Sequence, residues 1–282
     1  MKISYYPGCT LKTKARNLDV AALASLEKLG VEVRELDRWN CCGAVFSLTN
    51  DDLIHMIGPV RNLVRAKEQG ADKLVTLCSM CYNTLARANQ LIRNDKVKCA
   101  TINRFMDEEI DYFGEVEVVH YLNFVKDDVG WDKVREMVVA PVENLRIAPY
   151  YGCTLQRPAD VGIEPFGSFE IMGGLLEAIG AEVTEFDAAD KCCGSYQLLT
   201  SEGGAERPSA VVADSAIRAG AEAVVTSCPL CEYNLGRQGG VPTYYFTQLL
   251  AVALGVSEEE CHFQLNTPAS VDLLKEKGCL LV

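Results

Sequence analysis

Short apolar runs alternate with amphipathic segments along the whole chain. In its first part, apolar runs at 2–9, 31–36 and 73–77 are separated by segments at 17–29 and 51–69 whose apolar positions recur at helical spacing. Apolar strands of a few residues that alternate with helices are typical of crossover units in a parallel sheet. This pattern predicts an α/β fold.

The same succession returns in the second part of the chain. The corresponding segments are an apolar run at 145–153, a helix at 168–179, a strand at 182–186, a helix at 204–219 and a strand at 222–227. A further strand closes each part, at 116–120 in the first and at 242–246 in the second. The repeat predicts that the two parts share one architecture.

Short motifs keep the order and spacing of this repeat. The run Gly30-Val31-Glu32-Val33 returns as Gly180-Ala181-Glu182-Val183, and Tyr6-Pro7-Gly8-Cys9-Thr10-Leu11 returns as Tyr150-Tyr151-Gly152-Cys153-Thr154-Leu155. The first part also carries about 25 extra residues between Arg87 and Glu115. We therefore expect two tandem, pseudo-symmetric Rossmann-like domains with short parallel sheets, spanning residues 1–143 and 144–282.

Composition and charge narrow the class of protein. The chain has 282 residues with 49% hydrophobic residues, enough for two buried cores. Its net charge of −12 argues against a nucleic-acid partner, because phosphate binding needs a basic face. No apolar run reaches the ~20 residues that span a bilayer, and the first residues lack the pattern of a signal peptide. We expect a soluble cytoplasmic protein.

The cysteine content is unusual for such a protein. The chain has 13 cysteines and three histidines. An odd count without an export signal favours reduced thiols bound to metal over a disulfide framework. The scarcity of histidine argues against a His-rich zinc or copper site.

Ten cysteines recur as two sets of five. Each half supplies one cysteine, then Cys-Cys-Gly, then Cys-x-x-Cys. The positions are Cys9, Cys41, Cys42, Cys78 and Cys81 in the first half, and Cys153, Cys192, Cys193, Cys228 and Cys231 in the second. Because the carboxyl ends of parallel strands meet at one edge of a sheet, we expect each set to converge in one pocket.

Five thiols exceed the four that a zinc ion or an ordinary cubane cluster requires. Either one thiol is a bystander in both halves or the cluster is not an ordinary cubane. Adjacent cysteines suit a polynuclear cluster, so we favour iron–sulfur clusters, while structural zinc and a metal-free thiol–disulfide relay remain alternatives. Cys99, Cys261 and Cys279 lie outside the repeat, and we interpret them as buried or idle thiols.

This cysteine pattern, repeated over nearly the whole chain, resembles the duplicated cysteine-rich "CCG" domain family, and most closely the B subunits of heterodisulfide reductases. The resemblance implies two non-cubane [4Fe-4S] clusters, one bound by each set of five cysteines. It implies reduction of the coenzyme M–coenzyme B mixed disulfide between them. It also implies electron supply through a ferredoxin-like C subunit and a flavin-containing A subunit, with a hydrogenase or formate dehydrogenase.

Basic residues near the first cysteine of each set are candidates for binding an anionic substrate. They are Lys12, Lys14, Arg16 and Arg157. The alternative interpretation is that these side chains lie on solvated loops and bind no substrate. His120 follows a strand and is a weak candidate for a proton donor, although a structural histidine fits better. Gly43 and Gly194 are expected to allow the turn or a close approach of backbone to sulfur.

Two other functions stay open. The chain could be an electron-transfer subunit of a lactate, glycolate or succinate dehydrogenase. It could also be a non-catalytic scaffold whose metals hold an interface together.

Overall fold

The computed structural model describes residues 1–44, 53–199, 201, 203–237 and 239–280, although the side chains of residues 198 and 199 are not described. The strands are β1 (Lys2–Tyr5), β2 (Glu32–Glu35), β3 (Lys73–Thr76), β4 (Glu117–His120), β5 (Arg146–Pro149), β6 (Glu182–Val183), β7 (Ala223–Thr226) and β8 (Thr243–Tyr245). They form two parallel four-stranded sheets with the orders β2-β1-β3-β4 and β6-β5-β7-β8. The α/β prediction with two pseudo-symmetric parallel sheets is confirmed.

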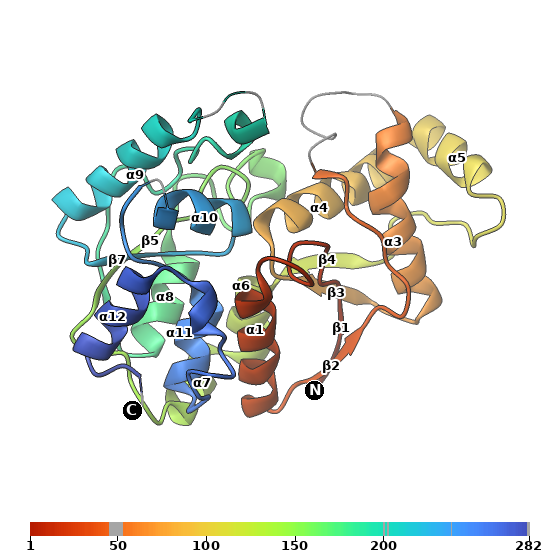
Figure 1. Ribbon diagram of the computed structural model, residues 1–282. Coiled ribbons are helices and arrows are strands. Elements are labelled where there is room, and N and C mark those ends of the chain that lie inside the picture. Colours follow the sequence, from red (N-terminus) through yellow and green to blue (C-terminus); the bar gives the residue numbers. More distant parts are fainter. Residues whose placement is uncertain (45–52, 200, 202, 238, 281–282) are drawn as a thin grey trace.

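Helices cover both sheets (Figure 1). They are α1 (Arg16–Lys28), α3 (Ile57–Glu68), α4 (Ser79–Asn94), α5 (Lys96–Phe105), α6 (Tyr121–Phe124), α7 (Trp131–Met137), α8 (Glu170–Ala178), α9 (Glu206–Arg218), α10 (Pro229–Arg237), α11 (Phe246–Ala253) and α12 (Pro268–Glu276). Short 3₁₀ or π turns lie at Leu53–Met56, Val125–Val129, Ala159–Val161, Ser195–Leu199 and Phe263–Leu265. Among the described residues, no helix is both long enough and apolar enough to cross a membrane.

The central strands explain the sheet order. All four residues of β7 are buried, as expected for a strand covered by helices on both faces. The edge strand β6 has only two residues, although the sequence pattern predicts 182–186. The equivalent edge strand β2 has four residues, so the edge position alone does not account for the length of β6.

The extra residues of the first half form the end of α4 and the whole of α5. Asp95 lies between these two helices, and its carboxylate accepts hydrogen bonds from the backbone N–H groups of Val97 (3.1 Å) and Lys98 (3.0 Å). An aspartate at this position satisfies backbone donors at the start of α5. The predicted helix at 51–69 begins with residues outside the described part of the chain, and α3 itself starts at Ile57.

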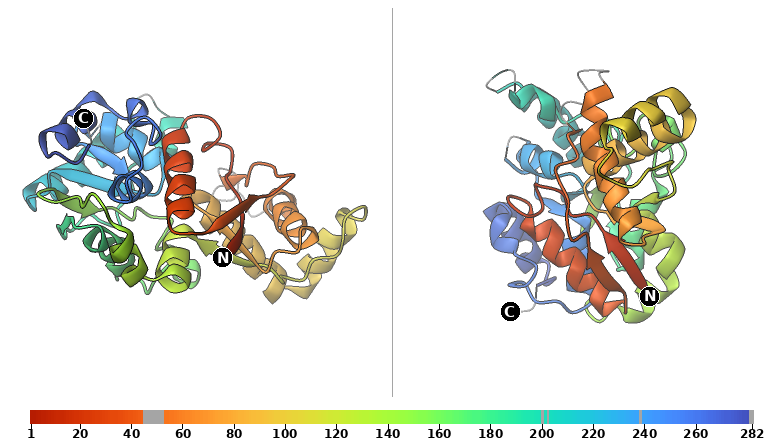
Figure 2. Two further views of the ribbon diagram at one scale, coloured as in Figure 1. Left: turned by 90° about the horizontal axis from the view of Figure 1, so that it is seen from below. Right: turned by 90° about the vertical axis from the view of Figure 1, so that its right-hand side faces the viewer.

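The halves join where α1 packs against α11 (Figures 1 and 2). Fully buried Ala21 and Ala22 allow the two helices to approach closely. The Thr247 hydroxyl donates to the Leu18 carbonyl (3.1 Å), and the Asn17 amide donates to Asn266 Oδ1 (3.0 Å). Buried polar contacts fix the orientation of the two halves, because misalignment would leave these groups without partners.

The helix seam gives a first testable prediction. Replacing Thr247 with Val should lower the free energy of unfolding by about 1 kcal/mol, because a buried hydrogen bond is lost without a change in volume. Thr101→Val is the matched control, since the exposed Thr101 hydroxyl donates to the Val97 carbonyl at 2.9 Å within α5. Urea denaturation should show at most a few tenths of a kcal/mol for the control, and equal losses in both variants would contradict the role of the seam.

Candidate metal centres

The first set of cysteines gathers at the carboxyl edge of the first sheet. Cys9 follows β1, and Cys78 lies between β3 and α4. The Cys9 and Cys41 sulfurs are 3.6 Å apart, and the Cys42 and Cys81 sulfurs are 3.5 Å apart. Cys81 also hydrogen-bonds with Cys78. The structure thus brings all five thiols of this set together.

The second set repeats this arrangement at the carboxyl edge of the other sheet. The Cys193 and Cys231 sulfurs are 3.5 Å apart. Cys153 is hydrogen-bonded with Cys192, and Cys228 with Cys231. Equivalent sulfurs are therefore in contact in both halves.

Thiols packed this closely compete for protons. Hydrogen bonds from Cys41 and Cys81 lower the pKa of Cys42 to about 5, while hydrogen bonding to Cys42 and Cys78 raises the pKa of Cys81 well above its usual range. In the second half, hydrogen bonds from Cys153 and Cys193 lower the pKa of Cys192, and hydrogen bonding to Cys192 raises the pKa of Cys153. A bound cation would take the place of the shared protons, so these donors fit a metal group.

The sulfur spacing bears on the kind of metal group. Two thiolates on one tetrahedral metal with bonds near 2.3 Å lie about 3.8 Å apart, close to the 3.5–3.6 Å contacts here. The described residues include no group of three or more His, Cys, Asp or Glu side chains placed around a single ion position. Each sulfur–sulfur distance given above joins two cysteines only.

Two buried tyrosines hold the Cys-Cys turns in place. The Tyr6 hydroxyl donates to the Asn40 carbonyl (2.9 Å), and the Tyr150 hydroxyl donates to the Lys191 carbonyl (2.6 Å). Asn40 and Lys191 are the residues directly before each Cys-Cys pair. The sequence alone assigns no role to these tyrosines. Their recurrence at equivalent positions of the repeat is the only sign of one.

Glycine allows the turns at the sulfurs. Gly43 (φ 73°) donates its N–H to the Cys41 sulfur at 3.5 Å, and Gly194 (φ 80°) donates to the Cys192 sulfur at 3.3 Å. These two glycines occupy the left-handed region, which other residues adopt at a cost. They form the turn and supply a backbone donor to sulfur.

A second pair of glycines lets the backbone pass close to the Cys-x-x-Cys sulfurs. A Cβ atom at Gly8 (φ 76°) would lie 2.8 Å from the Cys81 sulfur, and one at Gly152 (φ 63°) would lie 3.4 Å from the Cys231 sulfur. The first distance is shorter than van der Waals contact, so no side chain fits at Gly8 without a shift of the sulfur.

Helix starts contribute to both centres. Cys78 is the N-cap of α4, and Cys81 lies in its first turn. Cys228 precedes α10, whose first residue is Pro229. The free N–H groups and the positive dipole end of a helix stabilise a thiolate. This favours metal binding by Cys78 and Cys228.

The two centres approach each other across the seam. Cys231 and then the Ser79 hydroxyl from the first half lower the pKa of Cys228 to about 7, although burial opposes them. The Tyr196 hydroxyl of the second half donates to the Met80 sulfur (3.3 Å). Burial raises the pKa of Tyr196, and thiols of both halves act in the same direction. Cys78 and Cys228 therefore face the same interface.

Ser227, which precedes Cys228, is fully buried, and its hydroxyl has no hydrogen-bond partner in the described part of the chain. A buried hydroxyl without a partner is costly, and a sulfur-rich group at the centre would supply an acceptor. This supports the fit of the site to a metal–sulfur group.

His120 is fully buried between the centre and the seam. The neutral ring donates from Nε2 to the Leu77 carbonyl (2.9 Å) and accepts at Nδ1 from the Leu122 N–H (3.3 Å). Burial lowers the pKa of His120 to about 4. With both ring nitrogens engaged in backbone hydrogen bonds, the structure places His120 in a supporting position.

Two of the four basic candidates are engaged in ion pairs. Lys12 contacts Asp19 (2.9 Å) and Glu35 (2.7 Å), and Arg157 is paired with Asp190. Lys14 and Arg16 are exposed. Substrate binding by the four residues stays a prediction, and Lys14 and Arg16 are its freer members.

One residue near the second centre was not predicted from the sequence. Glu232 follows Cys231, hydrogen-bonds with Tyr245, and has its pKa raised to about 7 by burial. No sequence motif marks Glu232.

The three cysteines outside the repeat are buried, as expected. They are Cys99, Cys261 and Cys279, and burial raises the pKa of each thiol.

Comparison with known proteins gives consistent matches. The family model CCG, described as a cysteine-rich domain, matches residues 3–86 and 147–236. The chain is 30% identical over 94% of its length to the 8-methylmenaquinol:fumarate reductase membrane anchor subunit of Wolinella succinogenes, covering 96% of that protein. It is 28% identical over 97% of its length to the B subunit of the ferredoxin/F(420)H(2)-dependent CoB-CoM heterodisulfide reductase of Methanosarcina acetivorans, covering 96% of it.

The fold matches a solved structure. A hypothetical protein from Helicobacter pylori superposes with a TM-score of 0.74 at 14% sequence identity. The match covers 94% of this chain and 51% of the other, so this chain spans about half the length of that protein. The likeness supports the duplicated α/β architecture alone.

The tyrosine contacts give a prediction for the metal-free protein. Tyr6→Phe and Tyr150→Phe should each cost about 1 kcal/mol of unfolding free energy and loosen one Cys-Cys turn. Labelling with iodoacetamide, followed by mass spectrometry, should be severalfold faster at Cys41 in the first variant and at Cys192 in the second. Tyr121→Phe is the control, since its buried hydroxyl contacts Ser25 Oγ (2.8 Å) instead of a residue of a Cys-Cys turn. Faster labelling in the control would contradict the assignment.

Proposed function

This chain belongs to the cysteine-rich CCG domain family, and on that premise we propose that it is the disulfide-reducing subunit of a heterodisulfide reductase-type complex. Its substrate would be the mixed disulfide of coenzyme M and coenzyme B. The observation that carries the proposal is the presence of two complete five-cysteine sets, in which Cys78 and Cys228 face the same interface.

Each set would hold one four-iron cluster of the non-cubane type. The first would be bound by Cys9, Cys41, Cys42, Cys78 and Cys81, and the second by Cys153, Cys192, Cys193, Cys228 and Cys231. Contact between thiols from three separate motifs in each half supports this assignment. When bound, each cluster would supply electrons one at a time.

The reaction to be served is R–S–S–R′ + 2 e⁻ + 2 H⁺ → R–SH + R′–SH. Two electrons match two one-electron centres, which gives the duplication a chemical purpose. Met80, Ser79 and Cys78 are nearly inaccessible to solvent, so this side of the first set would be shielded from water. A dry surrounding protects thiolate and strengthens the electrostatic effect of nearby dipoles.

The chain must also provide protons for the two thiol products. Glu232 is placed to hold one, because burial raises the pKa of its carboxyl group to about 7 and it lies next to Cys231. A carboxyl group with this pKa exchanges protons readily near neutral pH. The Tyr245 hydroxyl, hydrogen-bonded with Glu232, would orient the carboxyl group.

Electrons would come from separate subunits. Relatives named as reductase subunits support membership in a multi-subunit complex. We propose a ferredoxin-like C subunit as the direct donor, fed by a flavin-containing A subunit with a hydrogenase or formate dehydrogenase.

A second candidate function is electron transfer to another subunit without cleavage of a disulfide. The 30% identity to a fumarate reductase subunit favours this alternative. The same ten cysteines would then relay electrons, and no small-molecule disulfide would enter the interface.

Metal content tests the ligand assignment. Anaerobically isolated protein should contain roughly eight irons per chain, and Cys81→Ser or Cys231→Ser should lower this to about four. Cys99→Ser and Cys261→Ser are matched controls, since both thiols are buried outside the sets, and they should keep the full complement. Zinc without iron in the wild-type protein would refute the cluster assignment.

Backbone approach to sulfur gives an independent test. Gly8→Ala should lower the iron content of the first centre strongly, because a Cβ atom would meet the Cys81 sulfur. Gly30→Ala is the control, since Gly30 has nearly the same φ (77° against 76°) but no atom within 4 Å of the added Cβ. Both variants should lose roughly 1–2 kcal/mol of stability from backbone strain, and iron should fall only in Gly8→Ala.

An assay with a reduced viologen dye separates the two functions, because a disulfide substrate would oxidise the dye through the protein. If the chain reduces a disulfide, the coenzyme M–coenzyme B disulfide should oxidise the dye at least tenfold faster than buffer, and coenzyme M should change the electron paramagnetic resonance spectrum of the oxidised protein. Full iron content with no response to the disulfide or to coenzyme M would instead support the electron-transfer role.

A further inference from the structure

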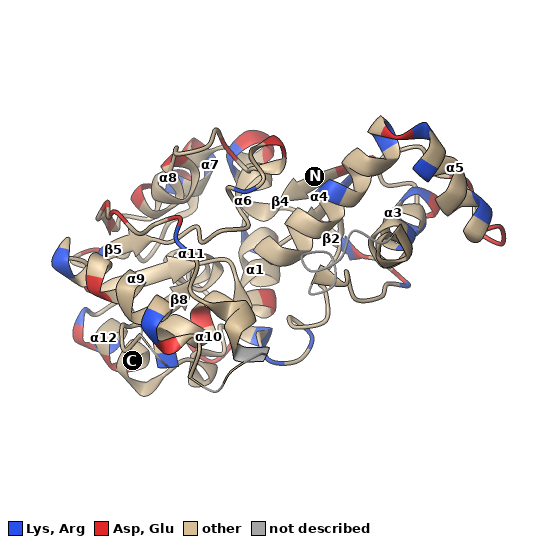
Figure 3. Cartoon of the chain, turned by 90° about the horizontal axis from the view of Figure 1, so that it is seen from above, with Lys and Arg blue, Asp and Glu red and all other residues tan. Residues whose placement is uncertain are grey.

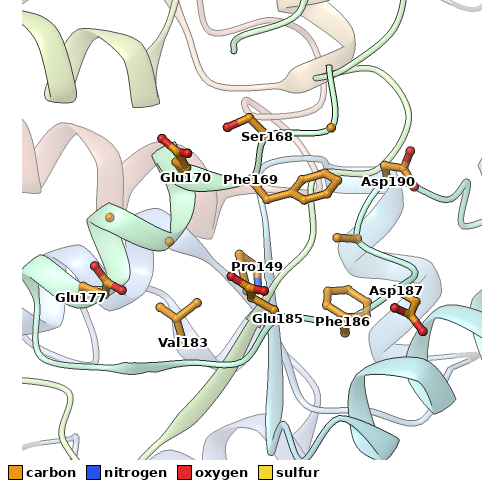
Figure 4. A pocket seen from close by; sticks show the side chains of 14 residues that line it. Pro149, Ser168, Phe169, Glu170, Glu177, Val183, Glu185, Phe186, Asp187 and Asp190 are labelled. Carbon is orange, nitrogen blue, oxygen red and sulfur yellow. The ribbon is translucent and has the colours of Figure 1, made fainter. Parts of the chain in front are cut away.

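A cavity lined by described residues lies in the second half of the chain. It has a volume of about 880 Å³ and lies between α8 and the segment that follows β6. Its apolar surface comes from Pro149, Phe169, Val183 and Phe186, and carboxylates surround it (Figure 4). The acidic positions on α8 and the adjoining loop are also visible in Figure 3.

The corresponding place in the first half is filled by the chain's own lysine. The Lys12 ammonium group contacts Glu35 Oε2 (2.7 Å) and Asp19 Oδ2 (2.9 Å). The Tyr5 hydroxyl donates to the other oxygen of Asp19 (2.5 Å). Tyr5, Asp19, Lys12 and Glu35 therefore form a closed polar network at this position.

Strand register fixes the equivalence of the two places. Lys2 pairs with Glu32 in the first sheet, and Arg146 pairs with Glu182 in the second. Counting along the strands, Pro149 and Glu185 take the positions of Tyr5 and Glu35. Both Pro149 and Glu185 line the cavity.

The helices and the first cysteines complete the comparison. The backbone bond from Val31 to Leu26 after α1 matches the one from Ala181 to Leu176 after α8, so Phe169 takes the position of Asp19. Gln156 takes the position of Lys12, three residues after the first cysteine. Its side chain turns inward, donating to the Ser168 carbonyl (2.9 Å) and accepting from the Gly167 N–H (3.0 Å).

The second half thus keeps the glutamate and lacks the lysine. Glu185, Glu177 and Glu170 make no ion pair within the described part of the chain, whereas Asp190 is paired with Arg157. The first half shows which group such a site accepts: a lysine side chain beside an aromatic residue. Charge complementarity and the apolar floor together favour a basic side chain with apolar neighbours.

We propose that this groove docks a partner protein through a segment that carries Lys or Arg next to apolar side chains. One basic side chain would reach Glu185 as Lys12 reaches Glu35, and apolar neighbours would cover Phe169 and Phe186. The position suits a subunit that exchanges electrons, because the carbonyl of Ala189 in the groove wall accepts N–H bonds from Tyr151 and Gly152, directly before Cys153 (both 3.0 Å). The docking goes beyond the proposed function and serves either candidate activity.

The test uses a fluorescein-labelled hexapeptide of alternating leucine and lysine and measures its Kd by fluorescence anisotropy at low salt. The double variant Glu177→Gln/Glu185→Gln should raise Kd at least tenfold. The control Asp107→Asn/Glu108→Gln also removes two exposed carboxylates, both near α5, and should change Kd less than twofold. An equal change in both double variants would show attraction by net charge alone and overturn the proposal.

A steric variant separates the groove from its charge. Gly173→Leu in α8 keeps all carboxylates and places a side chain toward Val183, the only residue outside its own helix within 4 Å of an added Cβ. It should weaken peptide binding at least tenfold with an unchanged melting temperature, since leucine favours a helix more than glycine does. Unchanged peptide affinity in a folded Gly173→Leu protein would overturn the proposal. Displacement of the peptide by spermine, at the same total concentration of positive charge, would overturn it too, because charge alone would then explain binding.

Discussion

The structure depends on holding five thiols in contact at one place, twice. Sulfurs 3.5–3.6 Å apart cannot all ionise without a cation, and the opposed pKa shifts of Cys42 and Cys81 express this competition. Several nearby features help to hold the thiols in contact or to stabilise thiolate. The Tyr6 hydroxyl fixes the turn before Cys41, the glycine after Cys42 donates an N–H to sulfur, and the start of α4 favours thiolate at its N-cap.

Much of this arrangement could be predicted from the sequence. The repeat of Cys, Cys-Cys-Gly and Cys-x-x-Cys at matching strand ends located ten thiols, because parallel strands present their carboxyl ends at one edge. Contacts that depend on side-chain direction could not be predicted. Spacing alone does not reveal that Tyr150 reaches the Lys191 carbonyl, or that Lys12 turns to Glu35 and Asp19 instead of toward a substrate.

The prediction of β6 was too long for a related reason. The strand pattern continues past Val183, and β2 at the same edge of the first sheet keeps four residues. After Val183 the chain leaves the sheet, and Glu185, Phe186, Asp187, Ala189 and Asp190 line the groove instead. The path of the chain toward the Cys-Cys turn is a property of the fold and not of the strand pattern.

Unequal loop length connects the seam to the groove. The segment between the first cysteine and α8 (residues 154–169) is ten residues longer than its counterpart before α1 (residues 10–15). This longer loop accepts hydrogen bonds from the first half at Arg157 (Asn83, 2.7 Å), Asp160 (Gln90, 2.8 Å) and Ile163 (Asn123, 2.8 Å). Its far end supplies Gly167, Ser168 and Phe169 to the groove. The insertion that ties the halves together therefore also draws Gln156 away from the place that Lys12 fills, so the open acidic groove of the second half is a geometric consequence of the way the halves are joined.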